Sequence, residues 1–229
     1  MLIGGLQKFT LIDYPDKTAC IVFLSGCNFR CPWCYSPELV LPEKIEKHPK
    51  IKEEEIFSFL SERKDKLDGV VLCGGEPTIH REIIDFSRKI KEMGFLLKLD
   101  TNGSNPEMIK RLMEKELIDY IAMDVKLPFS RYQEISSIDF EKIKESIRII
   151  KESSVDYEFR TTVVPGIHTE NDIAEIARSI EGAKKYFLQN FFPDKTLDSS
   201  FLRKKPFSKE ELDKLKEKAA PFVKMCQVR

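Results

Sequence analysis

The chain has 229 residues, of which 41% are hydrophobic, and its 38 lysines and arginines balance 38 aspartates and glutamates. A chain of this length can bury a substantial core, and its zero net charge argues against a protein whose main task is gripping nucleic acid or an anionic membrane. The sequence shows neither the ~20 apolar residues of a membrane span nor a signal-peptide pattern, so we expect a soluble, cytoplasmic protein.

Short apolar runs rich in β-branched residues alternate with amphipathic segments along the chain. In chain order they predict strand 18–25, helix 52–64, strand 70–73, helix 81–93, strand 95–99, helix 106–115, strand 120–123, helix 140–152, strand 157–164, helix 171–180 and strand 185–189. A capping box from Ser208 to Glu211 predicts a last helix, and 222–228 predict a closing strand.

Six strand–helix units in order predict a parallel sheet with right-handed crossovers. Because the strands are short and apolar, we expect an α/β fold in the form of a partial (β/α)6 barrel rather than a flat doubly wound sheet. Residues 1–229 are expected to form a single domain, with the motif-bearing core at about 15–193 and the last helix and strand at 206–229. The polar turns GGEP, DTNG, DVK and VPG each follow a strand, so we expect them together at the carboxyl edge, where such folds place active sites.

Three of the six cysteines lie on one short segment directly after the first predicted strand. Cys27, Cys31 and Cys34 have the spacing C-x3-C-x2-C, and in a reducing compartment such residues are metal ligands more often than disulfides. A structural zinc site normally has four protein ligands, and we find no good fourth ligand here. A 4Fe–4S cluster held by three cysteines would leave one iron open for an exogenous ligand. The spacing therefore favours an iron–sulfur cluster over zinc.

Taken together, these motifs resemble the radical S-adenosylmethionine (SAM) superfamily. The cysteine motif is followed in order by Gly74-Gly75-Glu76-Pro77, then by DTNG at 100–103, DVK at 124–126 and VPG at 164–166, which resemble the glycyl-radical-enzyme activases. The opening GLQKFTLIDYP at 5–15 and PELV at 37–40 are most like the short activating proteins of anaerobic ribonucleoside-triphosphate reductase. The resemblance extends from residue 5 to about 193, and it implies a partial barrel of the radical SAM type.

The resemblance implies a role for each motif. Cys27, Cys31 and Cys34 would ligate three irons of a 4Fe–4S cluster, and the fourth iron would bind the amino and carboxylate groups of SAM. Trp33 would lie against the adenine, and Glu76 would accept the charge of the methionyl amino group. The full set of implied cofactor contacts is Trp33, Tyr35, Gly74, Gly75, Glu76, Asp100, Asp124, Val125, Lys126 and Arg160. A monovalent cation beside the cofactor would be held by Asp100, Thr101 and Asp124.

The implied activity is that of an anaerobic oxidoreductase that activates a partner protein. One electron from the reduced cluster, delivered by a donor such as flavodoxin or ferredoxin, would cleave SAM to methionine and a 5′-deoxyadenosyl radical. That radical would remove hydrogen from a glycine of a glycyl radical enzyme, which we expect to be anaerobic ribonucleotide reductase. We expect no nucleic-acid or membrane partner.

Several alternatives stay open. The same chemistry would serve a small molecule such as a deazapurine precursor, as in the carboxy-deazaguanine synthases, and a zinc-stabilised scaffold or electron carrier would need no catalysis. Tyr35-Ser36 stand where the activases usually carry His-Asn, and 189–192 stand where some carry a cofactor-contacting histidine, which leaves the partner open. Arg160 fits a cofactor contact or a structural salt bridge equally. The isolated Cys20, Cys73 and Cys226 are interpreted as packed thiols.

Overall fold

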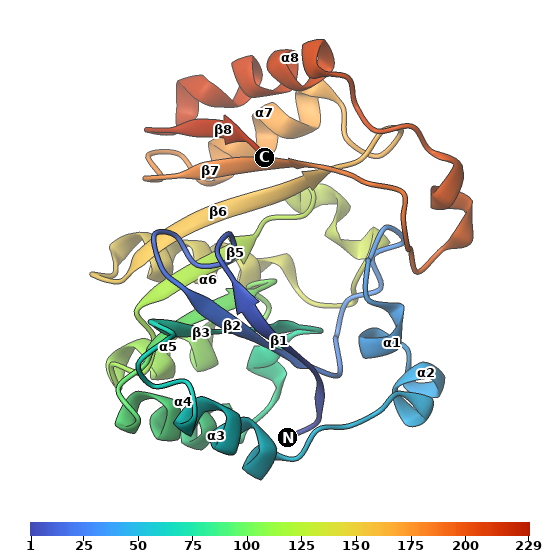
Figure 1. The fold of residues 1–229 in the computed structure, drawn as a ribbon. Coiled ribbons are helices and arrows are strands. Elements are labelled where there is room, and N and C mark those ends of the chain that lie inside the picture. The colour runs from blue at the N-terminus through green and yellow to red at the C-terminus, as the bar shows by residue number, and fades with distance from the viewer.

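Eight strands form one curled sheet in the computed structural model, which describes residues 1–229 (Figure 1). The strands are β1 (Ile3–Thr10), β2 (Ala19–Leu24), β3 (Gly69–Gly74), β4 (Leu96–Thr101), β5 (Tyr120–Asp124), β6 (Asp156–Val163), β7 (Tyr186–Asn190) and β8 (Cys226–Val228). They lie side by side in chain order, and every pair from β2 to β8 is parallel. Since β1 and β8 are unpaired edges, the barrel is partial, as the sequence predicts.

Helices connect successive parallel strands, and all but the first two cover the convex face of the sheet (Figure 1). They are α1 (Pro37–Val40), α2 (Pro42–Lys47), α3 (Glu53–Ser61), α4 (Ile83–Glu92), α5 (Pro106–Glu114), α6 (Phe140–Glu152), α7 (Glu170–Ser179) and α8 (Lys209–Ala219). The six predicted strand–helix units are confirmed, and so are the capping box at Ser208 and the closing strand. No helix has the combination of length and apolar character needed to cross a membrane.

One strand departs from the predicted parallel pattern. β1 pairs antiparallel with β2, and no strand is predicted for it. Its sequence, IGGLQKFT, contains two glycines and no regular alternation, and its middle residues are partly or largely exposed. Strand propensity is weak in such a segment, so pairing with the buried edge of β2 determines its conformation.

The two faces of the sheet bury different kinds of side chain, because successive residues of a strand point to opposite sides. A cluster of 51 buried residues, including Val22, Leu72 and Ile121, lies between the sheet and the helices. The concave face carries a small cluster at its base, where Tyr14 from the β1–β2 connection packs on Tyr120 with ring centroids 6.0 Å apart. Tyr14 thereby closes the floor of the barrel, and the space above it remains for the site.

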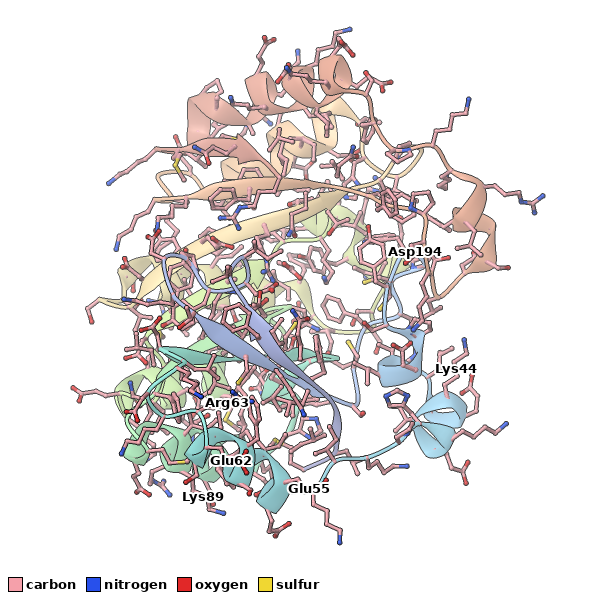
Figure 2. All side chains as sticks on the ribbon, in the orientation of Figure 1. Lys44, Glu55, Glu62, Arg63, Lys89 and Asp194 are labelled. Atoms are coloured by element: carbon pink, nitrogen blue, oxygen red, sulfur yellow. The ribbon has the colours of Figure 1, made fainter.

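Charged side chains cover the helical exterior. Figure 2 shows Lys44 on α2, Glu55 on α3 and Lys89 on α4, all of which are exposed. Such side chains are solvated and need no partner, in contrast to the charged groups of the concave face.

Candidate active site

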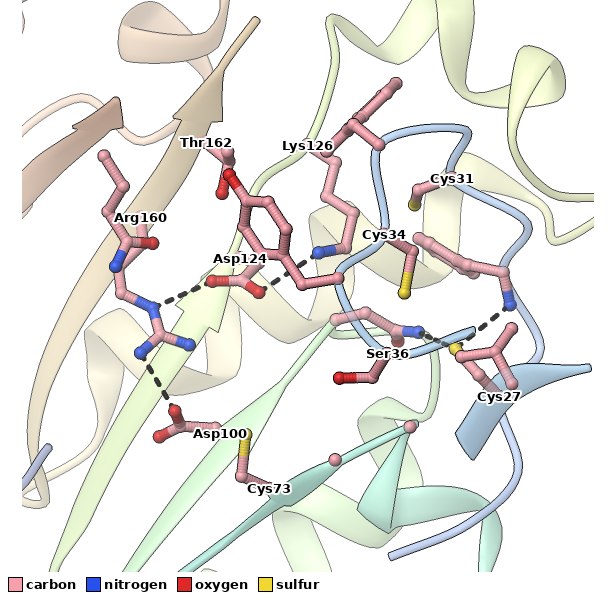
Figure 3. A pocket seen from close by; sticks show the side chains of 18 of the residues that line it. Cys27, Cys31, Cys34, Ser36, Cys73, Asp100, Asp124, Lys126, Arg160 and Thr162 are labelled. Atoms are coloured by element: carbon pink, nitrogen blue, oxygen red, sulfur yellow. Dashed lines mark hydrogen bonds and ion pairs between the residues drawn. The ribbon is translucent and has the colours of Figure 1, made fainter. Parts of the chain in front are cut away.

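A cavity of about 540 Å³ lies on the concave face, at the carboxyl ends of the parallel strands (Figure 3). Its wall includes all three clustered cysteines and the ends of β3 to β7. The sequence-predicted residues on this wall are Cys27, Cys31, Trp33, Cys34, Tyr35, Gly74, Gly75, Asp100, Thr101, Asp124, Lys126 and Arg160. The structure therefore brings the predicted motifs together at one edge of the sheet.

The cysteine loop follows β2 and contributes three free thiols to the cavity wall. Burial raises the pKa of Cys27 to about 11 and that of Cys31 to about 12, and the nearby Lys126 ammonium partly opposes the shift at Cys31. Both groups are therefore protonated at neutral pH until a metal displaces the proton. The backbone N–H of Phe29 donates to the sulfur of Cys27 over 3.4 Å, a contact that remains available to a bound thiolate.

The donor set fits an iron–sulfur cluster better than a single zinc ion. Thiolates are soft ligands that suit either one. A structural zinc ion normally takes four protein ligands, whereas three thiols on one cavity wall suit a cluster in which each cysteine binds one iron and the fourth iron stays open.

Two glycines let the GGEP turn pack directly on the cysteine loop. A Cβ atom at Gly75 would lie 1.9 Å from the carbonyl oxygen of Gly26, and one at Gly74 would lie 2.5 Å from the backbone of Leu24. Gly74 also has a φ of +114°, a conformation that side-chain-bearing residues rarely adopt. The backbone of the turn thus forms cavity wall, and close chain packing is a second reason for these glycines besides the expected approach of the cofactor.

Glu76 and Val125 are the two expected contact residues that do not line the cavity. The carboxylate of Glu76 is fully buried and accepts hydrogen bonds from Thr78 and Thr101 through Oε1 and from the Asn102 backbone N–H through Oε2, at 2.6–3.0 Å. Burial raises the pKa of Glu76 in spite of these donors. The carboxylate of Glu76 therefore ties the GGEP turn to the DTNG turn, and its expected contact with SAM stays a prediction.

Val125 has no exposed surface, and its expected cofactor contact likewise stays a prediction. Its backbone N–H donates to the carbonyl oxygen of Arg160 over 2.8 Å, and its own carbonyl oxygen accepts from the Thr161 hydroxyl over 2.6 Å. These bonds extend the β5–β6 pairing by one residue. Val125 thereby fixes the direction in which the chain leaves β5.

Five charged side chains with alternating sign cross the concave face from β4 to β6. Lys98 pairs with Oδ1 of Asp100, and Arg160 donates from one terminal nitrogen to Oδ2 of Asp100 over 2.9 Å. Arg160 also donates from Nε to Oδ1 of Asp124 over 2.8 Å, and Lys126 donates to Oδ2 of Asp124 over 3.1 Å (Figure 3). We call these five residues the charge array.

Strand register explains how the charge array forms. Lys98 and Asp100 are two residues apart on β4 and so share a face. Asp124 and Arg160 are direct partners in the parallel β5–β6 pairing. Burial alone would raise the pKa of Asp124, but Arg160 and Lys126 outweigh it and lower the pKa to about 2. Asp124 is therefore an anion at neutral pH. Arg160 lines the cavity and also forms two salt bridges, to Asp100 and Asp124.

Trp33 and Tyr35 connect the cysteine loop to the C-terminal half of the chain. Trp33 is 5% exposed and its ring meets the ring of His168 edge-on, with centroids 5.8 Å apart. Tyr35 is 40% exposed, stacks on Phe191 and accepts a hydrogen bond from the Phe192 backbone N–H over 2.8 Å. The two places where the sequence departs from the activase pattern thus contact each other at the cavity rim.

Sequence reasoning does not identify three charged residues of the concave face. Lys98 is one, and the others are Glu158 and Arg229, which form a salt bridge of 3.0 Å below the charge array. Glu158 is 1% exposed and also accepts from the hydroxyl of Tyr120 over 3.0 Å. Their signal was a charged residue at every second position of an apolar strand, as in Lys98 and Asp100 or Glu158 and Arg160, which marks a polar concave face.

Comparisons with known proteins identify the family. A sequence model of the radical SAM superfamily matches residues 21–180. A protein of Methanocaldococcus jannaschii with the provisional name glycyl-radical enzyme activating enzyme is 38% identical, and the match covers 100% of this chain and 95% of that protein. A 7-carboxy-7-deazaguanine synthase of Thermococcus kodakarensis is 26% identical over 66% of this chain and 65% of its own.

Solved structures share the fold. A domain of pyruvate-formate lyase-activating enzyme from Bacteroides vulgatus superposes with a TM-score of 0.55 at 19% identity, covering 70% of this chain and 98% of that one. Streptococcus suis SuiB bound to S-adenosylmethionine superposes with a TM-score of 0.65 at 14% identity, covering 91% and 51%. At these identities the likeness shows a common architecture alone.

Proposed function

This chain belongs to the radical SAM superfamily, and from that premise we propose that it is a cytoplasmic activating enzyme that installs a glycyl radical on a partner enzyme. We further propose anaerobic ribonucleotide reductase as the partner and flavodoxin or ferredoxin as the electron donor. The observation that carries the proposal is the identity of 38%, along the whole chain, to a protein named for glycyl-radical enzyme activation.

The cysteine loop is the proposed cluster site. Cys27, Cys31 and Cys34 would hold the cluster, because all three thiols are free and line the same cavity. When bound and reduced, a 4Fe–4S cluster supplies the one electron that cleaves SAM. The protein contributes the N–H group of Phe29 beside Cys27 and the positive charge of Lys126 near Cys31, and both favour thiolate over thiol.

The charge array is the proposed binding site for the methionyl carboxylate of SAM. The ammonium group of Lys126 makes one hydrogen bond to the protein, to Asp124, and one terminal nitrogen of Arg160 makes none. Both side chains line the cavity and so have donors left for a carboxylate. Gly74 and Gly75 supply backbone wall without side chains, and Trp33 and Tyr35 supply aromatic surface to the same cavity.

The open edges of the sheet support a macromolecular substrate. β1 and β8 do not pair, so the sheet is not closed into a full barrel. Tyr35 and Phe192 are 40% and 68% exposed at the cavity rim. An extended loop of a partner protein would find apolar contacts at this rim.

Electron paramagnetic resonance tests the proposal. Reconstituted protein, reductant, SAM and candidate partner are combined without oxygen, and the partner should acquire a glycyl radical doublet. The alternative is a small deazapurine precursor as substrate, which the T. kodakarensis relative supports. A deazapurine product, together with no doublet on any glycyl radical enzyme of the host, would establish the alternative instead.

A further inference from the structure

The two carboxylates of the charge array have no oxygen left without a cationic partner. Asp100 is contacted by Lys98 at Oδ1 and by Arg160 at Oδ2. Asp124 is contacted by Arg160 at Oδ1 and by Lys126 at Oδ2. The protein itself therefore supplies a positive charge to every carboxylate oxygen at which the expected monovalent cation would bind.

Thr101, the third residue expected to hold that cation, is engaged elsewhere. Its hydroxyl donates to Oε1 of Glu76 over 2.7 Å and accepts from the Gly103 backbone N–H over 3.1 Å. The hydroxyl is thus part of the buried hydrogen bonds that join two turns. Together with the occupied carboxylates, this means that Asp100, Thr101 and Asp124 do not fit a monovalent metal ion.

The charge of the array leads to the same conclusion. Lys98, Arg160 and Lys126 against Asp100 and Asp124 leave a net charge of +1. One bound carboxylate, such as the methionyl group of SAM, brings the total to zero. An added metal ion would leave an uncompensated positive charge in a region where Lys98 is 2% exposed and Arg160 12%, and such burial of charge is costly.

We propose that the ammonium group of Lys98 takes the place of a monovalent metal ion beside the cofactor, so that SAM binding is independent of Na⁺ and K⁺. Lys98 acts as a positioning residue, because it does not line the cavity and works through Asp100. Without Lys98, the array would have no net charge when empty and −1 once the methionyl carboxylate is added to it, and it would then attract a cation from solution. The inference rests on SAM as the ligand of the proposed site and is independent of which partner is activated.

The test measures SAM binding by isothermal titration calorimetry on reconstituted, unreduced protein, so that no cleavage occurs. Wild-type affinity should be the same within about twofold in NaCl, KCl and tetramethylammonium chloride at equal ionic strength. Lys98→Met should bind SAM at least about tenfold more weakly in tetramethylammonium chloride than in the better of the two metal salts. Wild-type affinity for SAM that changes tenfold with the cation would overturn the proposal. A Lys98→Met variant whose affinity does not depend on the cation would overturn it too.

Two control variants separate charge from folding. Lys110→Met removes an exposed lysine that pairs with Glu114 at 3.8 Å, and it should remain independent of the cation. Lys98→Met/Asp100→Asn returns the array to a charge of +1 and should lose the cation dependence of the single variant, whatever its absolute affinity. If Lys98→Met does not fold, the cation dependence of SAM binding in the wild type and in the double variant still tests the proposal. The titration contains no partner protein. Its result therefore does not depend on whether the protein forms a glycyl radical on a partner in a separate assay.

Discussion

Arg160 and Asp124 face each other across adjacent parallel strands, and Nε of the guanidinium group donates to the carboxylate over 2.8 Å. Arg160 also bridges to Asp100, so one side chain joins the ends of three strands. This bridge places two anions and one cation on the cavity wall before any ligand binds. It explains how a pattern of single residues at strand ends becomes a preorganised site.

Removal of the bridge should destabilise the protein. Arg160→Met leaves two carboxylates without their shared cation, and loss of one partner from a buried pair costs about 3–5 kcal/mol of unfolding free energy. Urea denaturation of the metal-free protein measures this change. Arg148→Met on α6, whose side chain is 56% exposed, is the matched control and should change little. Equal stability of the two variants would show that the bridge contributes nothing.

The stability that Asp124 contributes should depend on pH. Its pKa falls from an ordinary 3.8 to about 2 in the folded protein, so its contribution is complete above about pH 4 and is lost as the pH falls toward 2. A shift of this size corresponds to roughly 2 kcal/mol. The stability difference between wild type and Asp124→Asn should therefore be largest at pH 5 and shrink toward pH 2. Urea denaturation of the metal-free proteins across this range checks it, and a difference that stays constant with pH would contradict the assigned ion pairs.

Glu76 should act on stability more than on cofactor binding. Glu76→Gln replaces an acceptor oxygen by an amide nitrogen that faces buried donors, which costs about 1–3 kcal/mol. Thermal unfolding of the metal-free protein should show a lower midpoint than wild type. Glu92→Gln, an exposed position at the end of α4, provides the control. An unchanged midpoint for Glu76→Gln would mean that its four hydrogen bonds do not hold the turns together.

Tyr35 should matter more for the partner than for SAM. Tyr35→Ala removes the stack on Phe191, whose centroid is 5.9 Å away, and part of the apolar rim. We expect glycyl radical formation on the partner to fall by about tenfold, as for a central interface residue, and cleavage of SAM without partner to fall less, because Tyr35 also lines the cavity. Phe9→Ala removes an exposed ring on β1 and serves as control. A parallel loss of both activities would place Tyr35 in the cofactor site alone.

Sequence reasoning located the motifs because each one follows an apolar strand, and parallel strands align their carboxyl ends. That logic places Cys27, Asp100 and Asp124 on one cavity without knowledge of which strands are neighbours. It does not reveal Lys98 or Glu158, because their roles depend on strand register and on which face of the sheet is concave. It also does not reveal the hydrogen bonds of Glu76, since a carboxylate at a strand end can turn inward when two neighbouring turns offer four donors.

Strand β1 shows the same limit of prediction from the local sequence. IGGLQKFT lacks the period of a strand, and its conformation comes from a long-range pairing with β2. Tyr14, in the connection that follows, fills the barrel floor against Tyr120, and a Cβ atom at Gly69 would lie 2.9 Å from its ring. These are tertiary contacts that no local pattern predicts.

The cluster cysteines provide the most direct test of the account. Anaerobic reconstitution followed by iron analysis and measurement of 5′-deoxyadenosine compares Cys31→Ala with Cys226→Ala, which alters a buried thiol away from the cavity wall. We expect about four irons per chain and SAM cleavage in wild type and in Cys226→Ala. Cys31→Ala should lose both. SAM cleavage retained by Cys31→Ala, or one zinc and no iron in the wild-type protein, would contradict the assignment of the cysteine loop as the catalytic centre.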